Sequence, residues 1–167
     1  MKPVTLLLLF FLVVITGCDS PQKPPAAKVH IVKDLVSRPE PIGVMIDRIA
    51  TDFDIPPVIA FNLVDTESDF DENALSKTNA VGLAQVLRST AKSECGIDKL
   101  HILAKPNNNL RCGFSYLSKL KKQFGTWDKA LIAYNVGGAH VKNPKLNPTK
   151  YVEGVLYAKN ILRGFKS

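Results

Sequence analysis

The stretch ESDFDENALSKTNAVGLAQVLRSTA, residues 67–91, decides how this chain is interpreted. Its first residue, Glu67, follows Leu63 and Val64 by four and three residues, a spacing that places all three on one helix face. A carboxyl group on an apolar face loses hydration and gains a raised pKa, as a general acid near neutral pH requires. The alternative is a frayed helix end that carries Glu67 into water, and its position alone leaves both readings open.

The residues after Glu67 are polar, so residues 69–79 are expected to form a loop. Residues 80–93 are predicted as a helix that ends near Gly96. Asp71 is the nearest acid by helical spacing that could serve as the second carboxylate of ordinary glycoside hydrolysis. Its polar surroundings are typical of a solvated loop, so the pattern supports Asp71 only weakly.

Apolar residues recur at helical spacing through the rest of the chain. A first helix is predicted from Pro41 onward, with Ile42, Met45, Ile46 and Ile49 on one face. Later helices are predicted over 107–124, 127–134 and 149–165, and the last two are separated by a loop containing Gly137, Gly138, Pro144 and Pro148. No convincing run alternates as a strand would, so the predicted class is mainly α.

Composition is that of an ordinary globular protein of one domain. The chain has 167 residues, 46% of them hydrophobic and 22% charged, which excludes a disordered or wholly membrane-embedded protein. A formal charge of +7 favours an anionic partner such as nucleic acid, acidic lipid or a cell-wall polymer. Only Lys119, Lys121 and Lys122 form a tight basic group, so we expect no nucleic-acid site.

The amino terminus has the features of an export signal. An apolar run from Val4 to Ile15 is too short to span a bilayer but has the length of a secretory signal core. It ends in Ile15-Thr16-Gly17-Cys18, which resembles a bacterial lipobox; the alternative is a plain signal peptide with an incidental cysteine. We therefore expect a signal peptide over 1–17, a Pro-containing tether over 18–40 that begins with lipidated Cys18, and a folded domain over 41–167.

The remaining cysteines, Cys95 and Cys112, form an even pair in an exported chain. A disulfide and two buried free thiols are both compatible with the sequence. Asp19 follows the lipidated position and resembles a signal for retention in the inner membrane of enteric-type bacteria, with the domain facing the periplasm.

Several ordered motifs together resemble the soluble-lytic-transglycosylase (SLT) domain family, from about Ile42 to Leu162. They are Glu67-Ser68, Ala74-Leu75-Ser76, Gly82-Leu83-Ala84-Gln85, Thr90-Ala91, Asn109-Leu110 with Gly113, Tyr116-Leu117, Ala133-Tyr134-Asn135 and Tyr151-Val152. The chain departs from the usual family pattern at Asn79, Ala84 and Arg88, where Gly, Met and Pro are common. None of these changes removes the acid.

The resemblance implies a lysozyme-like helical fold with a cleft, which cuts the β-1,4 bond between N-acetylmuramic acid and N-acetylglucosamine in peptidoglycan. Glu67 would protonate the leaving oxygen and then accept a proton from the sugar's 6-hydroxyl, giving a 1,6-anhydro end without attack by water. The substrate's acetamido group would stabilise the cationic carbon, so a second protein carboxylate is not needed.

Four further residues gain expected roles from the same resemblance. Ser76 and Gln85 would orient the sugar, Tyr134 would hydrogen-bond near Glu67, and Asn135 would support the cleft. Gly82 would allow close backbone approach beside the helix of Glu67.

No cofactor and no metal are expected, since His30, His101 and His140 have no ligand spacing. The chain is expected to be a monomer. Two alternative functions stay open: a hydrolytic muramidase, and a non-catalytic peptidoglycan-binding lipoprotein.

Overall fold

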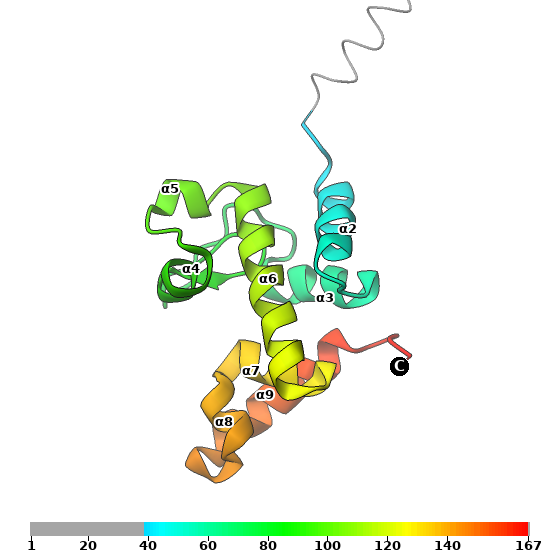
Figure 1. Ribbon diagram of the computed structural model, residues 1–167, viewed down its shortest axis with the longest axis vertical. Helices are drawn as coiled ribbons and strands as arrows, with labels where there is room; N and C mark the ends of the chain where they lie inside the picture. Colours follow the sequence, from blue (N-terminus) through cyan, green and yellow to red (C-terminus); the bar gives the residue numbers. More distant parts are fainter. Residues whose placement is uncertain (1–38, 167) are drawn as a thin grey trace, which may run out of the picture. The chain divides into compact units, whose positions relative to one another are not determined.

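Helices make up most of the chain that the computed structural model describes, residues 39–166 (Figure 1). They are α2 (Ile42–Asp52), α3 (Pro57–Ser68), α4 (Arg88–Cys95), α5 (Leu100–Leu103), α6 (Pro106–Phe124), α7 (Trp127–Val136), α8 (Gly138–Lys142), the 3-10 helix η1 (Pro144–Leu146) and α9 (Pro148–Ile161). The described residues also hold one small hairpin, in which β1 (Ala80–Val81) pairs antiparallel with β2 (Val86–Leu87). The predicted mainly α class is confirmed.

The predicted signal peptide, the lipidation at Cys18 and nearly all of the predicted tether lie outside the described residues. None of the helices between residues 39 and 166 combines the length and the apolar character needed to span a bilayer.

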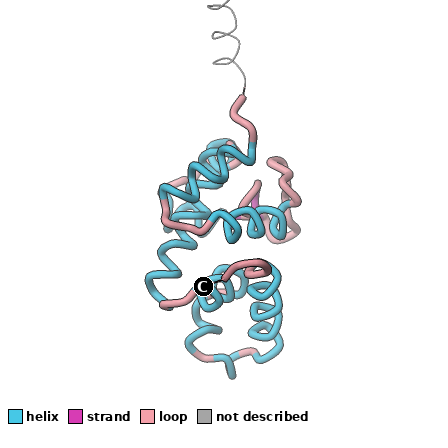
Figure 2. Tube along the Cα trace, turned by 90° about the vertical axis from the view of Figure 1, so that its right-hand side faces the viewer, coloured by secondary structure: helices cyan, strands magenta, loops and turns pink. Residues whose placement is uncertain are grey.

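The long helix α6 organises the domain. Figures 1 and 2 show that α2 and α3 lie toward one end of α6. The helices α7, α8 and α9 lie toward its other end. Its predicted apolar face is buried through Leu110, Phe114, Leu117 and Leu120. Because these side chains contact helices from both ends, burial of one amphipathic face holds the whole domain together.

The helix predicted from Pro41 and the helix that carries Glu67 form where the apolar spacing placed them. In α2 the side chains of Ile46 and Ile49 are fully buried. Pro57 stands in the first turn of α3, where its missing N–H costs no helical hydrogen bond. In the same helix Leu63 and Val64 have no exposed surface, so α3 turns the predicted stripe toward the core.

The predicted helix over residues 80–93 is wrong in its first half. Residues 80–87 form the hairpin, because Gly82 and Gln85 adopt left-handed backbone angles, φ 71° and 41°, which no helix tolerates. The helix starts only at Arg88, and its predicted end is confirmed, since Gly96 closes it at φ 66°. Two-residue strands are too short to produce an alternating pattern, so no strand could be predicted here.

The predicted loop over residues 137–148 contains two short helices, α8 and η1, that the sequence analysis missed. It also missed α5. Helices of three to five residues complete barely one turn, so hydrophobic periodicity cannot reveal them.

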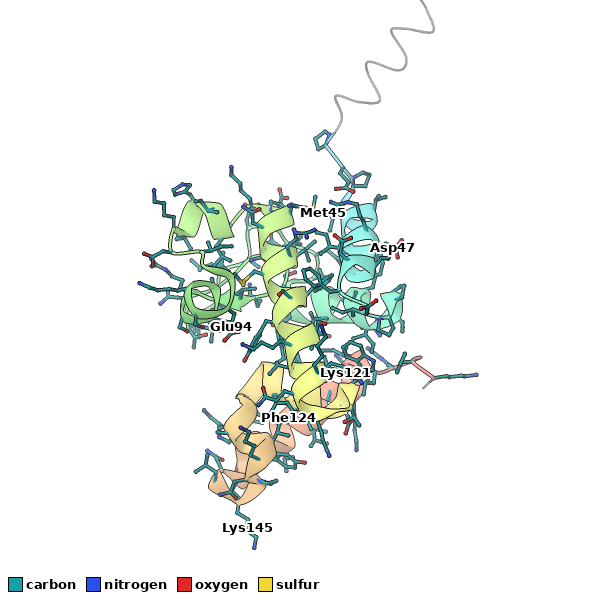
Figure 3. The ribbon with its side chains drawn as sticks, in the orientation of Figure 1. Met45, Asp47, Glu94, Lys121, Phe124 and Lys145 are labelled. Carbon is teal, nitrogen blue, oxygen red and sulfur yellow. A yellow bond between two sulfur atoms is a disulfide. The ribbon has the colours of Figure 1, made fainter. Side chains whose placement is uncertain are left out.

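A disulfide joins Cys95, the last residue of α4, to Cys112 in α6, with the two Cα atoms 5.7 Å apart (Figure 3). Of the two alternatives left by the sequence, the structure contains the bonded pair. The bond fixes α4, which directly follows the hairpin, against the central helix.

Replacing both cysteines by serine is expected to lower the free energy of unfolding by about 3 kcal/mol, because the closed loop restricts the unfolded chain. Urea denaturation with and without reductant measures the effect. Reductant should lower the urea midpoint of the wild type and leave that of the Cys95→Ser/Cys112→Ser variant unchanged. A wild-type midpoint that is the same with and without reductant would contradict this expectation.

Candidate active site

Glu67 is the second-last residue of α3 and is half-buried. The helix end is anchored and not frayed: the Ser68 hydroxyl donates to the carbonyl oxygens of Val64 at 3.0 Å and Leu83 at 2.9 Å. Asp69 then leaves the helix with φ 51°. The bond to Leu83 ties the end of α3 to the hairpin, so the backbone that carries Glu67 is held from two sides.

Burial raises the pKa of Glu67 to about 7, and a hydrogen bond from Tyr157 opposes that rise by a smaller amount. The Tyr157 hydroxyl donates to Glu67 Oε1 from α9, 90 residues further along the chain. Burial and the charge of Glu67 hold the pKa of Tyr157 well above its usual value, so this phenol stays a donor. Glu67 is thus protonated through most of the acidic range and ionises near neutrality.

Tyr134 lies near Glu67 but bonds elsewhere. Its hydroxyl donates to the carbonyl oxygen of Ala84 at 2.7 Å, and its ring packs 5.6 Å from that of Tyr116. Burial and then the charge of Glu67 raise the pKa of Tyr134 well above its usual value. The hydroxyl on the carboxyl group itself is that of Tyr157, which the sequence analysis missed.

The hairpin is held by Asn109 of α6, a fully buried side chain. Its Oδ1 accepts from the backbone N–H of Ala84 at 2.8 Å, and its Nδ2 donates to the carbonyl oxygen of Val81 at 2.7 Å. A Cβ on Gly82 would lie 2.7 Å from Asn109 Nδ2. Gly82 therefore admits the Asn109 amide of α6.

Gln85 follows in the turn between the two strands. Its Nε2 donates to the carbonyl oxygens of Ala74 at 3.2 Å and Gly82 at 3.0 Å. A small pocket of about 30 Å³ brings Gln85 together with Tyr134 and Tyr116. Gln85 and Tyr134, two of the predicted substrate-binding residues, therefore share one pocket. The pKa of Tyr134 is also raised by the charge of Glu67, so this pocket is near the acid.

Ser76 and Asn135, the other two predicted binding residues, differ in their surroundings. The Ser76 hydroxyl accepts from the backbone N–H groups of Thr78 at 3.2 Å and Ala80 at 2.9 Å, and so shapes the loop before β1. Asn135 is exposed and makes no side-chain hydrogen bond within residues 39–166. Asn79 has φ 63°, the left-handed angle that Asn tolerates in place of Gly.

Ala84, a departure from the family pattern, is fully buried and faces Gly113 of α6. A Cβ on Gly113 would lie 2.6 Å from that of Ala84. Larger side chains at either position would push the hairpin away from α6.

Among the described residues, no other carboxylate contributes to the pKa shift of Glu67. Asp71 is exposed, and its Oδ1 accepts from the backbone N–H of Asn73 at 2.8 Å, a turn within the loop. No group of three or more His, Cys, Asp or Glu in residues 39–166 is placed to hold a metal ion. The chemistry available here is that of one carboxyl group and two tyrosines.

Comparison with known proteins identifies the family. The model of the transglycosylase SLT domain matches residues 44–153, more than half of the chain. Membrane-bound lytic murein transglycosylase C of Haemophilus influenzae is 33% identical over 87 residues, and transglycosylase F of Pseudoalteromonas translucida is 36% identical over 88. Each match covers 48% of this chain but only 24% and 18% of the relative, so the chain spans a quarter or less of either protein.

Solved structures agree on the fold. The 70 kDa soluble lytic transglycosylase of Escherichia coli matches with a TM-score of 0.63 at 23% identity, over 82% of this chain and 26% of that one. An inactive mutant of the lytic transglycosylase Slt from Pseudomonas aeruginosa matches with a TM-score of 0.58 at 25% identity, over 71% and 22%. The predicted lysozyme-like helical class is confirmed, and the chain belongs to the transglycosylase SLT domain family.

Proposed function

We propose that this protein is a peptidoglycan lytic transglycosylase in which Glu67 is both the general acid and the general base. It cleaves the β-1,4 bond between N-acetylmuramic acid and N-acetylglucosamine and leaves a 1,6-anhydro end. The observation that carries the proposal is a single half-buried carboxyl group whose pKa is raised to about 7. Membership of the SLT domain family and the names of the relatives support the reaction and the substrate.

The first step needs a proton donor. Protonated Glu67 gives its proton to the glycosidic oxygen, and the bond from that oxygen to C1 of the muramic residue breaks. Positive charge develops at C1, where the acetamido oxygen of the same sugar stabilises it. Glu67 is left as a carboxylate, which the Tyr157 hydroxyl stabilises by hydrogen bonding.

The second step needs a base at the same place. The Glu67 carboxylate accepts the proton of the 6-hydroxyl as O6 bonds to C1, which closes the anhydro ring. Glu67 is protonated again and no water is consumed. A pKa near the working pH suits a group that must donate in one step and accept in the next.

The surroundings of Glu67 support this scheme over hydrolysis, because no other acid is coupled to it within residues 39–166. An inverting or retaining hydrolase pairs two carboxyl groups across the scissile bond. The causes that shift the pKa of Glu67 are burial and Tyr157, with no contribution from a neighbouring acid. Asp71, the alternative base, is exposed and engaged in its own loop.

The expected roles of the neighbouring residues remain proposals. Gln85 and Tyr134 would contact the sugar from the shared pocket, which their fixed hydrogen bonds preorganise. Ser76 would act through the loop that it shapes, and exposed Asn135 is free to meet the glycan.

We place the enzyme at the cell envelope through a lipid on Cys18, as a monomer with a signal peptide over 1–17, a tether over 18–40 and the catalytic domain over 41–167. The word membrane-bound in the names of its relatives supports this location. Asp19 favours the inner membrane. Radiolabelled palmitate should enter the wild type and not a Cys18→Ser variant; equal labelling of both would exclude this cysteine as the anchor.

The test of the reaction is mass spectrometry of the products that the full-length chain releases from purified peptidoglycan. Products that end in 1,6-anhydro-muramic acid support the transglycosylase. Reducing ends would indicate a muramidase, and no cleavage by a folded protein would indicate a peptidoglycan-binding lipoprotein.

Removing the Tyr157 hydroxyl is expected to move the pH profile of cleavage. Its hydrogen bond favours the carboxylate, so Tyr157→Phe should raise the pKa of Glu67 above about 7. Since the first step needs protonated Glu67, the alkaline limb of the profile should move to higher pH. Tyr151→Phe, on the same helix, is the control and should leave the alkaline limb of the pH profile unchanged. An unchanged alkaline limb in Tyr157→Phe would contradict the role of Tyr157 in stabilising the Glu67 carboxylate.

A further inference from the structure

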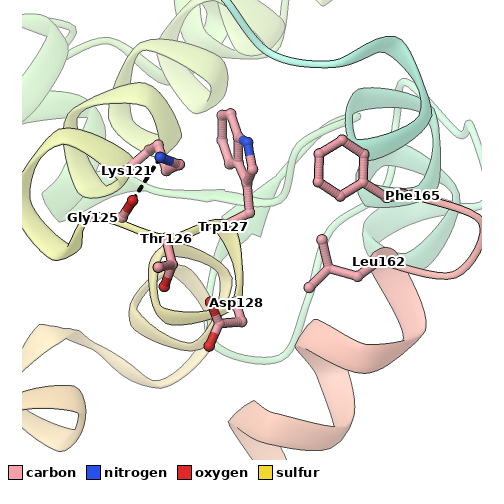
Figure 4. A pocket seen from close by; sticks show the side chains of 7 residues that line it. All are labelled: Lys121, Gly125, Thr126, Trp127, Asp128, Leu162 and Phe165. Carbon is pink, nitrogen blue, oxygen red and sulfur yellow. Dashed lines mark hydrogen bonds between the residues drawn. The ribbon is translucent and has the colours of Figure 1, made fainter. Parts of the chain in front are cut away.

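A further pocket has a lining that does not include Glu67. It has a volume of about 480 Å³, within the range of small-ligand sites. Its walls come from the end of α6, the start of α7 and the chain after α9, and include Trp127, Leu162 and Phe165 (Figure 4). None of its lining residues hydrogen-bonds to the Glu67 carboxyl group or lines the pocket of Gln85 and Tyr134.

One face of the Trp127 indole is covered by Lys121, and the other lines the pocket. Figure 4 shows its ring between Lys121 and Phe165. Lys121 Nζ lies 5.5 Å from the centre of the indole and donates to the carbonyl oxygen of Gly125 at 2.7 Å. This ammonium supports the indole from behind, and the opposite face looks across the pocket toward Phe165.

Polar groups lie beside these apolar walls. Thr126 and Asp128, on either side of Trp127 in the chain, also line the pocket. A hydroxyl and a carboxylate next to two aromatic rings suit a ligand that offers an apolar face and several hydroxyl groups, as a pyranose ring does. Both polar groups are exposed and can hydrogen-bond to a sugar's hydroxyls, which an acyl chain does not offer, so a sugar fits better than a lipid tail.

Basic residues outnumber acidic ones among the lining residues and their neighbours in the chain. Lys121 lines the pocket itself, and Asp128 is its only acidic lining residue. Lys122, Lys129 and Lys166 stand directly beside lining residues in the chain. A sugar polymer that carries carboxylates matches this field, and a neutral one does not.

We infer that this pocket is a second glycan site, which holds an uncleaved sugar of an anionic cell-wall strand while another part of the strand is at Glu67. The sugar ring lies between Trp127 and Phe165, its hydroxyls bond to Asp128 and Thr126, and the strand's carboxylates face the lysines. The identity of the polymer rests on the proposed function.

Trp127 is the only tryptophan of the chain, so its fluorescence reports this pocket directly. The full-length chain in detergent, with Glu67→Gln to prevent cleavage, is titrated with the carboxylated tetrasaccharide of alternating N-acetylglucosamine and N-acetylmuramic acid. A saturable change in Trp127 emission is expected. Phe165→Ala should weaken the apparent affinity about tenfold, Asp128→Asn should also weaken it, and the neutral tetramer of N-acetylglucosamine should bind less tightly.

A Gln85→Ala control should keep the Trp127 signal, because that residue lies in the other pocket. Circular dichroism checks that each variant is folded. If the tetrasaccharide does not change the Trp127 emission, the second site is overturned, even when the wild type cleaves peptidoglycan normally. A change produced only by anionic phospholipid vesicles would overturn it in favour of a lipid site. If the tetrasaccharide changes the Trp127 emission but the wild type cleaves no peptidoglycan, the proposed reaction is contradicted and the second glycan site is supported.

Discussion

Replacing Glu67 by glutamine should lower the rate of peptidoglycan cleavage about 10³-fold, because proton transfer by a placed side chain contributes on that order. The amide keeps the size of the side chain and still accepts the hydrogen bond from Tyr157. It cannot supply the proton in the first step or take one in the second. Release of dye from labelled cell walls measures the rate.

The same variant has a second readout that separates lost chemistry from lost folding. The pKa of Glu67 is about 7 in the folded chain and near 4.5 in the unfolded one. The unfolded carboxyl group ionises first as pH rises, so the wild type loses stability between pH 4.5 and 7. Glu67→Gln has no such loss. Above pH 7 its free energy of unfolding should exceed that of the wild type by on the order of 2 to 3 kcal/mol.

Thermal unfolding at pH 4 and pH 8 is the measurement. Equal stability at pH 4 and a more stable variant at pH 8 would fit a buried acid. The same gap at both pH values would contradict the burial of Glu67, and full cleavage by the variant would contradict its role.

The second large effect is expected at Asn109. Asn109→Ala should destabilise the domain by about 3 kcal/mol, because it leaves the N–H of Ala84 and the carbonyl of Val81 buried without their partner. It also opens a void beside Gly82, where the amide packs closest. Urea denaturation monitored by circular dichroism gives the change in the free energy of unfolding.

Asn108→Ala is the matched control, one residue away. Asn108 is half-buried and makes one bond, from Nδ2 to the carbonyl oxygen of Ile102 at 3.0 Å. Its loss should cost about 1 kcal/mol. Similar losses for both variants would mean that Asn109 does not hold the hairpin in the way described.

The sequence was informative where the physics is local. The face of α2 with Ile46 and Ile49 and the stripe of α3 with Leu63 and Val64 follow from helical spacing alone, and both are buried. That stripe also placed Glu67 on the inner side of its helix. Motif order supplied the family and the lysozyme-like class, which periodicity could not.

The parts that the sequence could not predict depend on contacts between distant residues. Tyr157 is 90 residues from Glu67, and the pattern of α9 does not reveal which of its tyrosines turns inward. The resemblance led us to expect Tyr134 near the acid, where it lies, but not that the acceptor of its hydroxyl is the carbonyl oxygen of Ala84. The hairpin exists because Asn109, 25 residues beyond Ala84, supplies its hydrogen bonds, and a local pattern carries no trace of such a partner.

The central claim is that one half-buried carboxyl group remains protonated until near neutrality and can therefore serve as acid and base in turn. Its most direct test is a carbon-13 NMR titration of the full-length chain labelled at glutamate side-chain carboxyls, with Glu67→Gln to assign the signal. The account predicts that the Glu67 signal titrates with a midpoint of about 7. A midpoint near 4.5, the value of an unperturbed glutamate, would contradict it.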